Sequence, residues 1–309
     1  TQNIRMGSLR IRERLAGIQS ETEHYEEMVE ELIWNEVSSF KKMYLKDRKI
    51  ENIMLIGDVF TDSVYQNIEE KTTKIISREN FNTWYEKIIH QSPMELAVKL
   101  GIPLENASLM YPSAVIYKCL IDMMGAEHIW IPGVHMTRGI AYEYAEQMKL
   151  LKGGHNFEND ILMAAKNIGK RYAVNRPHVQ NLEMTALAMF DATKKMHGMK
   201  ERERLLLQMA VMLHDVGKYI SFNNVADSSY NIIMSNEIIG LSHIEREMVA
   251  LIAKYNTAVL PSYDELVMES SLSAEQYLTV SELTAIVRLA NALDRSHLQK
   301  IQACLLYTS

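Results

Sequence analysis

The stretch from Ala210 to Lys218 constrains this chain more than any other. An apolar run, predicted to be helical, brings His214 and Asp215 side by side, and Gly217 and Lys218 follow at once. Neighbouring helical side chains point about 100° apart, so His214 and Asp215 can both reach one ion beside the helix. Gly217 leaves room for a close approach to the backbone. Lys218 places a positive charge where a phosphate could sit. A His-Asp pair alone is more often a surface pair or a helix end.

Composition limits the class of protein. The 309 residues are 47% hydrophobic and 23% charged, which is typical of a soluble globular protein and favours two domains. The net charge of −6 disfavours a nucleic-acid binder, although a local basic groove for a phosphorylated substrate stays open. The two cysteines lie far apart without metal-ligand spacing, which indicates a reducing compartment such as the cytoplasm. No apolar run is long enough to span a membrane.

The first part of the chain, residues 1–152, predicts an α/β lobe. Strands are expected at 4–12, 53–57 and 128–131, from alternating or short apolar runs. Helices are expected over 22–46, 112–124 and 137–149. Another helix begins at Ser92, an N-cap that is followed by Pro93 and Glu95. Strands and helices alternate, as in α/β proteins.

The second part, residues 153–303, predicts an all-α domain. Gly153 and Gly154 interrupt the alternating pattern and indicate a domain boundary near residue 152. Apolar residues then recur at helical spacing over 158–173, 178–197, 201–217, 229–238, 243–255 and 281–301. Ser242 and Glu245 form a second capping box. Residues 304–309 show no helix-capping pattern, and the chain starts at Thr1. We therefore expect a fragment that ends in a truncation tail.

Two further residues complete a candidate metal site. His178 opens a predicted helix, and Asp294 lies on an apolar helical stripe where an unpaired carboxylate is costly to bury. With His214 and Asp215, they supply two imidazoles and two carboxylates from three helices. Such mixed nitrogen and oxygen ligands suit Mn, Mg, Fe or Ni better than a structural zinc site, which tends to use cysteine.

These four residues, in this order in an all-α domain, resemble the HD phosphohydrolase superfamily. Relatives in that superfamily often add two histidines between the His-Asp pair and the last aspartate. The comparable positions here hold Asp227, which could ligate a metal, and Asn256, which is a poor ligand. A single-metal site is therefore the hypothesis, and an empty, vestigial site is the alternative.

The chain as a whole resembles the exopolyphosphatase and guanosine pentaphosphate phosphatase (Ppx/GppA) family. The matching stretches are Arg5 to Ile11, Ile56–Gly57, Tyr111 to Ala114, Arg138 to Ile140, and the helical motifs at 214–220 and 289–295. The resemblance implies the second lobe of an actin-like, RNase H-like phosphatase domain, followed by an HD-type helical domain. The family's first lobe, with the acid that positions water, would then lie before Thr1.

The resemblance implies a hydrolase that releases terminal phosphate from inorganic polyphosphate or guanosine pentaphosphate with the help of magnesium. We expect the divalent metal to be Mg or Mn, and no nucleic-acid or membrane partner. The resemblance also implies a homodimer. We expect His178, His214, Asp215 and Asp294 to bind the metal and Lys218 to steady the phosphate. The candidate substrate-binding residues are Gly57, Arg138, Lys170, Arg171 and Arg176.

Two alternatives stay open. The HD-type domain is itself a metal-dependent nucleotide phosphohydrolase, or it is a non-catalytic module that binds polyphosphate or dimerises. Lys166, Lys170 and Arg171 share one helix face, which is either a track for a polyanion or an ordinary solvated face.

Overall fold

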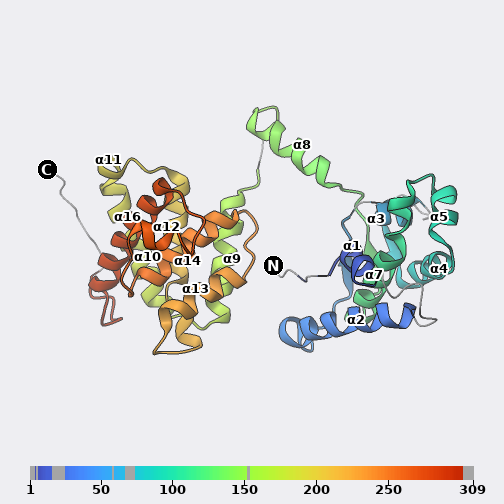
Figure 1. Cartoon of the computed structure of the whole chain (residues 1–309), viewed down its shortest axis with the longest axis horizontal. Coiled ribbons are helices and arrows are strands. Elements are labelled where there is room, and N and C mark those ends of the chain that lie inside the picture. Colours follow the sequence, from blue (N-terminus) through green and yellow to red (C-terminus); the bar gives the residue numbers. More distant parts are fainter. Residues whose placement is uncertain are drawn as a thin grey trace. The chain divides into compact units, whose positions relative to one another are not determined.

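The computed structural model describes residues 4, 6–15, 25–57, 59–66, 74–151 and 154–301, which form two compact units (Figure 1). The described residues of the N-terminal unit are those up to 151, and the C-terminal unit begins at 154. Helices predominate in both units. No helix in these ranges combines the length and the apolar character that crossing a lipid bilayer requires.

The N-terminal unit contains a small sheet of three strands in the order β1-β3-β2. These strands are β1 (Asn52–Met54), β2 (Ile75–Ser77) and β3 (His128–Trp130). Strand β1 pairs parallel to β3, with Ile53 opposite Ile129, and β2 pairs antiparallel to β3, with Ile76 opposite Ile129. Ile76 and Ile129 are buried, so one face of the sheet contributes to the core.

Helix α7 is the centre of the N-terminal unit, because α1, α2, α3, α4 and α6 all pack against it. Its residues Ala114, Val115 and Ile121 are completely buried. The helices of this unit are α1 (Ser8–Leu15), α2 (Tyr25–Phe40), α3 (Val59–Gln66), α4 (Arg78–Ile89), α5 (Pro93–Leu100), α6 (Leu104–Ala107), α7 (Met110–Met124) and α8 (Met136–Gln147). A π-helical turn, Lys41–Leu45, extends α2. Helix α5 begins with the predicted capping box of Ser92 and Glu95.

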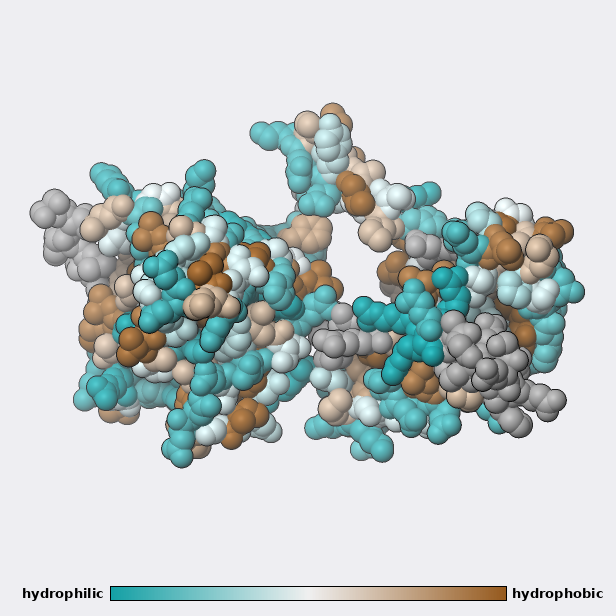
Figure 2. Space-filling view, in the orientation of Figure 1, coloured by the Kyte–Doolittle hydropathy of each residue, from teal (hydrophilic) through white to brown (hydrophobic). Residues whose placement is uncertain are grey.

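Helix α8 differs from the other long helices because none of its residues is buried. Apolar side chains along α8, including Met136, Ile140 and Tyr144, are exposed. Figure 2 shows further apolar residues scattered over the visible face of each unit, among more numerous polar ones.

The strand predicted for residues 4–12 is wrong. Ser8–Leu15 forms helix α1, and its Ile11 is buried in the core, where α1 packs on α7. A short run of apolar residues can form either a helix or a strand, and contact with α7 decides between them. Arg5, the first residue of a stretch that matches the Ppx/GppA family, lies outside the described residues. Strand β2 and helices α3 and α4 were not predicted, although the buried residues Phe81, Trp84, Tyr85 and Ile88 of α4 recur at helical spacing.

The C-terminal unit is helical, as predicted, and its described residues contain no strand. Helix α12 is central and packs against α9, α10, α14 and α16. From Leu205 to Leu213, every residue of α12 except Gln208 is buried. The helices are α9 (Phe157–Arg171), α10 (Arg176–Ala192), α11 (Lys194–His197), α12 (Glu201–Leu213), α13 (Val225–Ser235), α14 (His243–Tyr255), α15 (Tyr263–Leu266) and α16 (Ala274–Leu293). A 3-10 turn, Val216–Tyr219, follows α12.

Several helix boundaries in this unit differ from prediction. The helix expected over 201–217 ends at Leu213, so the His-Asp pair lies in the turn after α12. The helix expected over 281–301 is α16, which ends at Leu293, just before Asp294. The helix expected over 178–197 is interrupted at Thr193, between α10 and α11. Polar side chains that hydrogen-bond the free backbone groups at a helix end, as His214 does, compete with continuation of the helix.

Candidate metal centre

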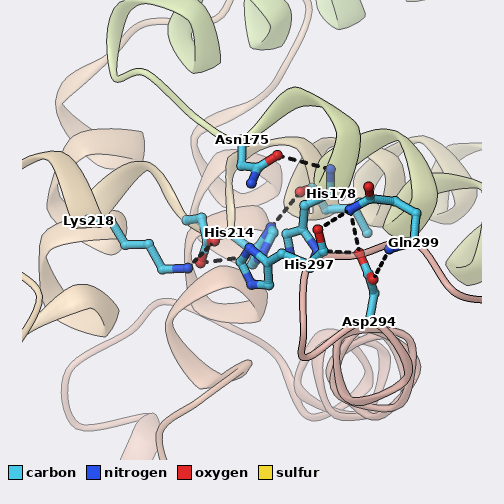
Figure 3. A network of polar contacts seen from close by, with 9 residues as sticks. Asn175, His178, His214, Lys218, Asp294, His297 and Gln299 are labelled. Carbon is cyan, nitrogen blue, oxygen red and sulfur yellow. Dashed lines mark hydrogen bonds and ion pairs between the residues drawn. The ribbon is translucent and has the colours of Figure 1, made fainter.

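Three of the four predicted ligands lie together inside the C-terminal unit (Figure 3). His178, His214 and Asp215 each offer one ligand atom, and these atoms all lie within 4.8 Å of one another. His178 lies in the first turn of α10, whereas the other two lie in the turn after α12. All three residues are buried. The fold thus assembles a polar cluster from segments that are distant in sequence.

His178 is fixed at both its backbone and its ring. Asn175, the N-cap of α10, accepts a hydrogen bond from the backbone N–H of His178 at 3.2 Å. Nδ1 of the ring lies 2.8 Å from Oδ2 of Asp294, which is itself 1% exposed at the end of α16. A carboxylate that accepts from Nδ1 leaves the lone pair on Nε2, the tautomer that binds metal ions.

His214 is held in the same tautomer by the backbone. Its Nδ1 donates to the carbonyl of Val211 at 2.8 Å. The buried hydroxyl of Ser229, on α13, donates to the His214 carbonyl and accepts from the Gly217 N–H, both at 3.0 Å. Helix α13 therefore packs directly on the turn that carries the His-Asp pair.

Gly217 allows this packing. A Cβ added at Gly217 would lie 2.3 Å from the carbonyl oxygen of Val225 and 2.6 Å from the backbone nitrogen of Ser229. The close approach that the sequence predicts at Gly217 is thus an approach by helix α13.

Among the described residues, the Nε2 atoms of His178 and His214 find no hydrogen-bond partner, although both are buried. Such unpaired polar atoms are rare, because each costs roughly 1–3 kcal/mol. The Nε2 of His214 lies 3.3 Å from Oδ1 of Asp215. Two unpartnered nitrogen lone pairs beside one carboxylate fit a divalent cation, so the residues present are compatible with the predicted metal.

The charges in the cluster agree with this interpretation. Burial lowers the pKa of His214, because desolvation penalises its protonated form. Burial alone would raise the pKa of Asp215, but His214 and the Lys218 ammonium outweigh it and lower that pKa. The Nζ of Lys218 donates to Oδ2 of Asp215. A neutral imidazole and an ionised carboxylate are the forms that bind metal ions.

Asp294 lies behind His178 rather than among the three clustered ligand atoms. Its carboxylate accepts from His178, from the backbone N–H of Gln299 at 2.8 Å and from the Gln299 side chain at 3.3 Å. Burial would raise the pKa of Asp294, but these hydrogen bonds outweigh it and lower that pKa. Asp294 is therefore an ionised acceptor that orients His178.

The remaining predicted residues lie elsewhere. Lys170 and Arg176 line one pocket with Lys166, whereas Arg171 donates to Asn236 at 3.5 Å. Gly57 and Arg138 belong to the N-terminal unit. The Gly57 carbonyl accepts from the Thr61 hydroxyl at 2.8 Å, and Arg138 is exposed on α8. Their roles in substrate binding stay predictions.

The two positions that depart from the HD pattern are engaged in other contacts. Asp227 forms an ion pair with Lys254 at 2.9 Å, and the side chain of Asn256 accepts from Asn291 at 3.4 Å. Asp227 does not belong to the cluster of three ligand residues, and Asn256 lines the same pocket as Asp215.

Sequence reasoning missed three residues around the centre: Ser229, His297 and Gln299. Nothing in the sequence distinguishes Ser229 from any other helical serine. For His297 and Gln299, the sequence shows only that both lie close to Asp294 along the chain. It does not show that the chain folds back onto Asp294.

Comparison with known proteins relates this helical unit to a family of phosphatases. Residues 162–308 match the family model described as Ppx/GppA phosphatase, domain III. A guanosine-5'-triphosphate,3'-diphosphate pyrophosphatase from Vibrio atlanticus (strain LGP32) is 20% identical over 190 residues. That similarity includes 60% of this chain and 36% of the relative, so the chain spans about a third of the length of the relative it matches.

Proposed function

The chain belongs to the Ppx/GppA phosphatase family, and from this premise we propose that it acts in the hydrolysis of phosphoanhydride bonds. The proposed substrates are inorganic polyphosphate and guanosine pentaphosphate, each of which would lose a terminal phosphate. We further propose that the helical unit is of the HD type and holds a divalent metal. The observation that carries the proposal is the pair of buried, unpartnered Nε2 atoms beside Asp215.

His178, His214 and Asp215 would hold the ion directly. Of the two metals predicted, two imidazoles favour Mn over Mg, which prefers oxygen ligands. Asp294 would orient His178 through Nδ1, and the Val211 carbonyl would do the same for His214. When bound, such an ion polarises a phosphoryl oxygen and lowers the pKa of a water molecule.

Lys218 is the residue best suited to meet the substrate. Its side chain is 38% exposed, whereas the Asp215 carboxylate that it contacts is 10% exposed. Lys218 therefore reaches from the buried centre toward solvent. Turned from Asp215 to a phosphoryl oxygen, its ammonium would stabilise the charge that develops as the anhydride bond breaks.

A second candidate function is polyphosphate binding without cleavage. Lys166, Lys170 and Arg176 line one pocket together with Met163 and Val179. Three cations around one pocket suit a polyanion. At the metal centre, the pairing of Asp227 with Lys254 favours a site simpler than a two-metal site.

The test is phosphate release from long-chain polyphosphate and from guanosine pentaphosphate, with Mg²⁺ or Mn²⁺. The chain is compared with its Asp215→Ala variant, and the metal content of both is measured after purification in manganese. Release that disappears in the variant would assign the chemistry to the helical unit. Equal release would assign it outside this centre. Wild-type metal content below about a tenth of an equivalent would contradict the metal centre.

A further inference from the structure

A third histidine lies against the candidate metal centre (Figure 3). The ring of His297 stacks on the ring of His178, with centroids 3.8 Å apart and planes inclined by 3°. His297 is half-buried and lies beyond the end of α16. In the part of the chain that the structure describes, no group hydrogen-bonds its ring nitrogens. A half-exposed imidazole with free nitrogens is available to a ligand.

The backbone holds His297 in this position. In the segment 294–299, which we call the clasp, the His297 N–H donates to the Asp294 carbonyl at 2.8 Å. The Gln299 N–H donates to the Asp294 carboxylate at 2.8 Å, and the Gln299 side chain donates to the His297 carbonyl at 2.7 Å. The clasp thus places the ring through the backbone carbonyl of Asp294 and through Gln299, which also bonds the buried Asp294 carboxylate.

Two residues of the clasp have left-handed backbones, with φ of 55° at His297 and 48° at Gln299. This conformation is uncommon and unfavourable for residues other than glycine and persists where surrounding contacts enforce it. The clasp is therefore a specified structure rather than a trailing helix end.

His297 lines the same pocket as Asp215 and Lys218. This pocket, of about 610 Å³, is also lined by Arg288 and Arg295. Arg288 is engaged with the backbone carbonyls of Tyr255 and Ala258. Lys218 and His297 come from different elements, the turn after α12 and the clasp after α16. An anion in the pocket could therefore contact both at once.

We propose that His297 is a substrate-binding residue, which donates a ring N–H to an oxygen of a terminal phosphoryl group beside Lys218. This inference rests on the proposed function. It adds to that function a residue that binds the terminal phosphoryl group of the substrate.

The stacking argues against His297 as a further metal ligand. An imidazole binds a metal ion in its own ring plane, through a nitrogen lone pair. The ring of His297 covers the face of His178, and its nitrogens are not among the ligand atoms clustered within 4.8 Å. His297 is therefore better placed for the anion than for the ion.

The test is calorimetric titration of the full chain with imidodiphosphate, a pyrophosphate analogue that resists hydrolysis. It is run with and without Mn²⁺, and Mn²⁺ itself is titrated separately. His297→Gly removes the ring and tolerates the left-handed backbone. Gln299→Gly loosens the clasp and keeps the ring. His243→Ala is the control, because His243 is exposed on α14 and contacts only Arg246 through its side chain among the described residues. Circular dichroism checks that each variant is folded.

We expect His297→Gly to weaken imidodiphosphate binding about tenfold, the loss of one charge-assisted hydrogen bond, and to leave Mn²⁺ affinity unchanged. Gln299→Gly should cause a smaller loss, and His243→Ala none. Unchanged imidodiphosphate binding in His297→Gly, or no wild-type binding, would overturn the inference. A fall in Mn²⁺ affinity would overturn it by making His297 a ligand. A wild type that binds imidodiphosphate through His297 but binds no Mn²⁺ would uphold the inference and contradict the metal centre.

Discussion

The carboxylate of Asp294 hydrogen-bonds Nδ1 of His178 at 2.8 Å across 116 positions of sequence, and both residues are buried. This contact joins the end of α16 to the first turn of α10. It also selects which nitrogen of His178 carries the free lone pair. In the proposed metal centre, Asp294 would thus orient His178, whereas the sequence predicts both residues as ligands.

Replacing Asp294 by asparagine tests this relationship. The amide is similar in shape but no longer fixes the His178 tautomer, so we expect Mn²⁺ affinity to fall by about 10- to 100-fold. Calorimetric titration with Mn²⁺ measures the change. Asp227→Asn is the matched control, because Asp227 pairs with Lys254 outside the cluster. Equal affinity in wild type and Asp294→Asn would show that the contact does not tune the centre, and complete loss would make Asp294 a direct ligand.

Gly217→Ala should destabilise the C-terminal unit. The added methyl would meet the backbone of α13 at 2.3 Å and 2.6 Å, and a backbone cannot turn away as a flexible side chain can. We expect a loss of about 1–3 kcal/mol or more in the free energy of unfolding, measured in urea.

The control for Gly217 is Gly139→Ala in α8. A Cβ there meets no atom of the described residues within 4 Å, and alanine favours helix. This substitution should leave stability equal or raise it by about 0.5–1 kcal/mol. Equal effects of the two substitutions would contradict the packing of α13 on the His-Asp turn.

Local signals in the sequence predicted the parts of the fold that depend on local chemistry. The capping boxes at Ser92 and Ser242 begin helices as expected, since a cap and its partner lie three residues apart. The helical character of the second unit follows from sustained apolar periodicity. Residues 4–12 were mispredicted because the packing of Ile11 in the core beside α7 decides their structure, and no local pattern contains that contact.

The residues of the candidate site likewise include some that the sequence predicts and others that depend on packing between helices. His178, His214 and Asp215 were predicted because the spacing and residue types resemble a known pattern. The contact of Ser229 with the His214 carbonyl and the stacking of His297 on His178 depend on how helices meet. Such contacts between distant residues have no local signature. They required the structure.

Acid should weaken the contact between α12 and α14. The hydrogen bonds of Glu245 with Arg202, more than those with Ser242, lower the pKa of Glu245 to about 2. Because the folded-state pKa is below the ordinary value of 4.5, its contribution is complete above about pH 4.5 and is lost as the pH falls toward 2.

Thermal melts of Glu245→Gln between pH 7 and pH 3 measure this contribution. We expect the variant to melt a few degrees lower than wild type at pH 7, with the difference shrinking at pH 3. Glu201→Gln is the control, since among the described residues that carboxylate pairs with Lys194 at the exposed surface. A difference that stays constant with pH would contradict the assignment.

Lys218→Met should change metal binding and anion binding in opposite directions. The Lys218 ammonium donates to the Asp215 carboxylate, so it competes with a divalent ion for the same oxygen. Methionine retains much of the apolar stem and removes the charge. We expect Mn²⁺ affinity to rise, and imidodiphosphate affinity to fall about tenfold because one cation leaves the pocket. Calorimetric titration with each ligand gives both values, and Lys254→Met is the control for loss of a lysine elsewhere. Parallel losses of both affinities would mean that Lys218 supports the centre structurally, whereas opposite changes would identify it as the group that leaves Asp215 to meet the phosphate.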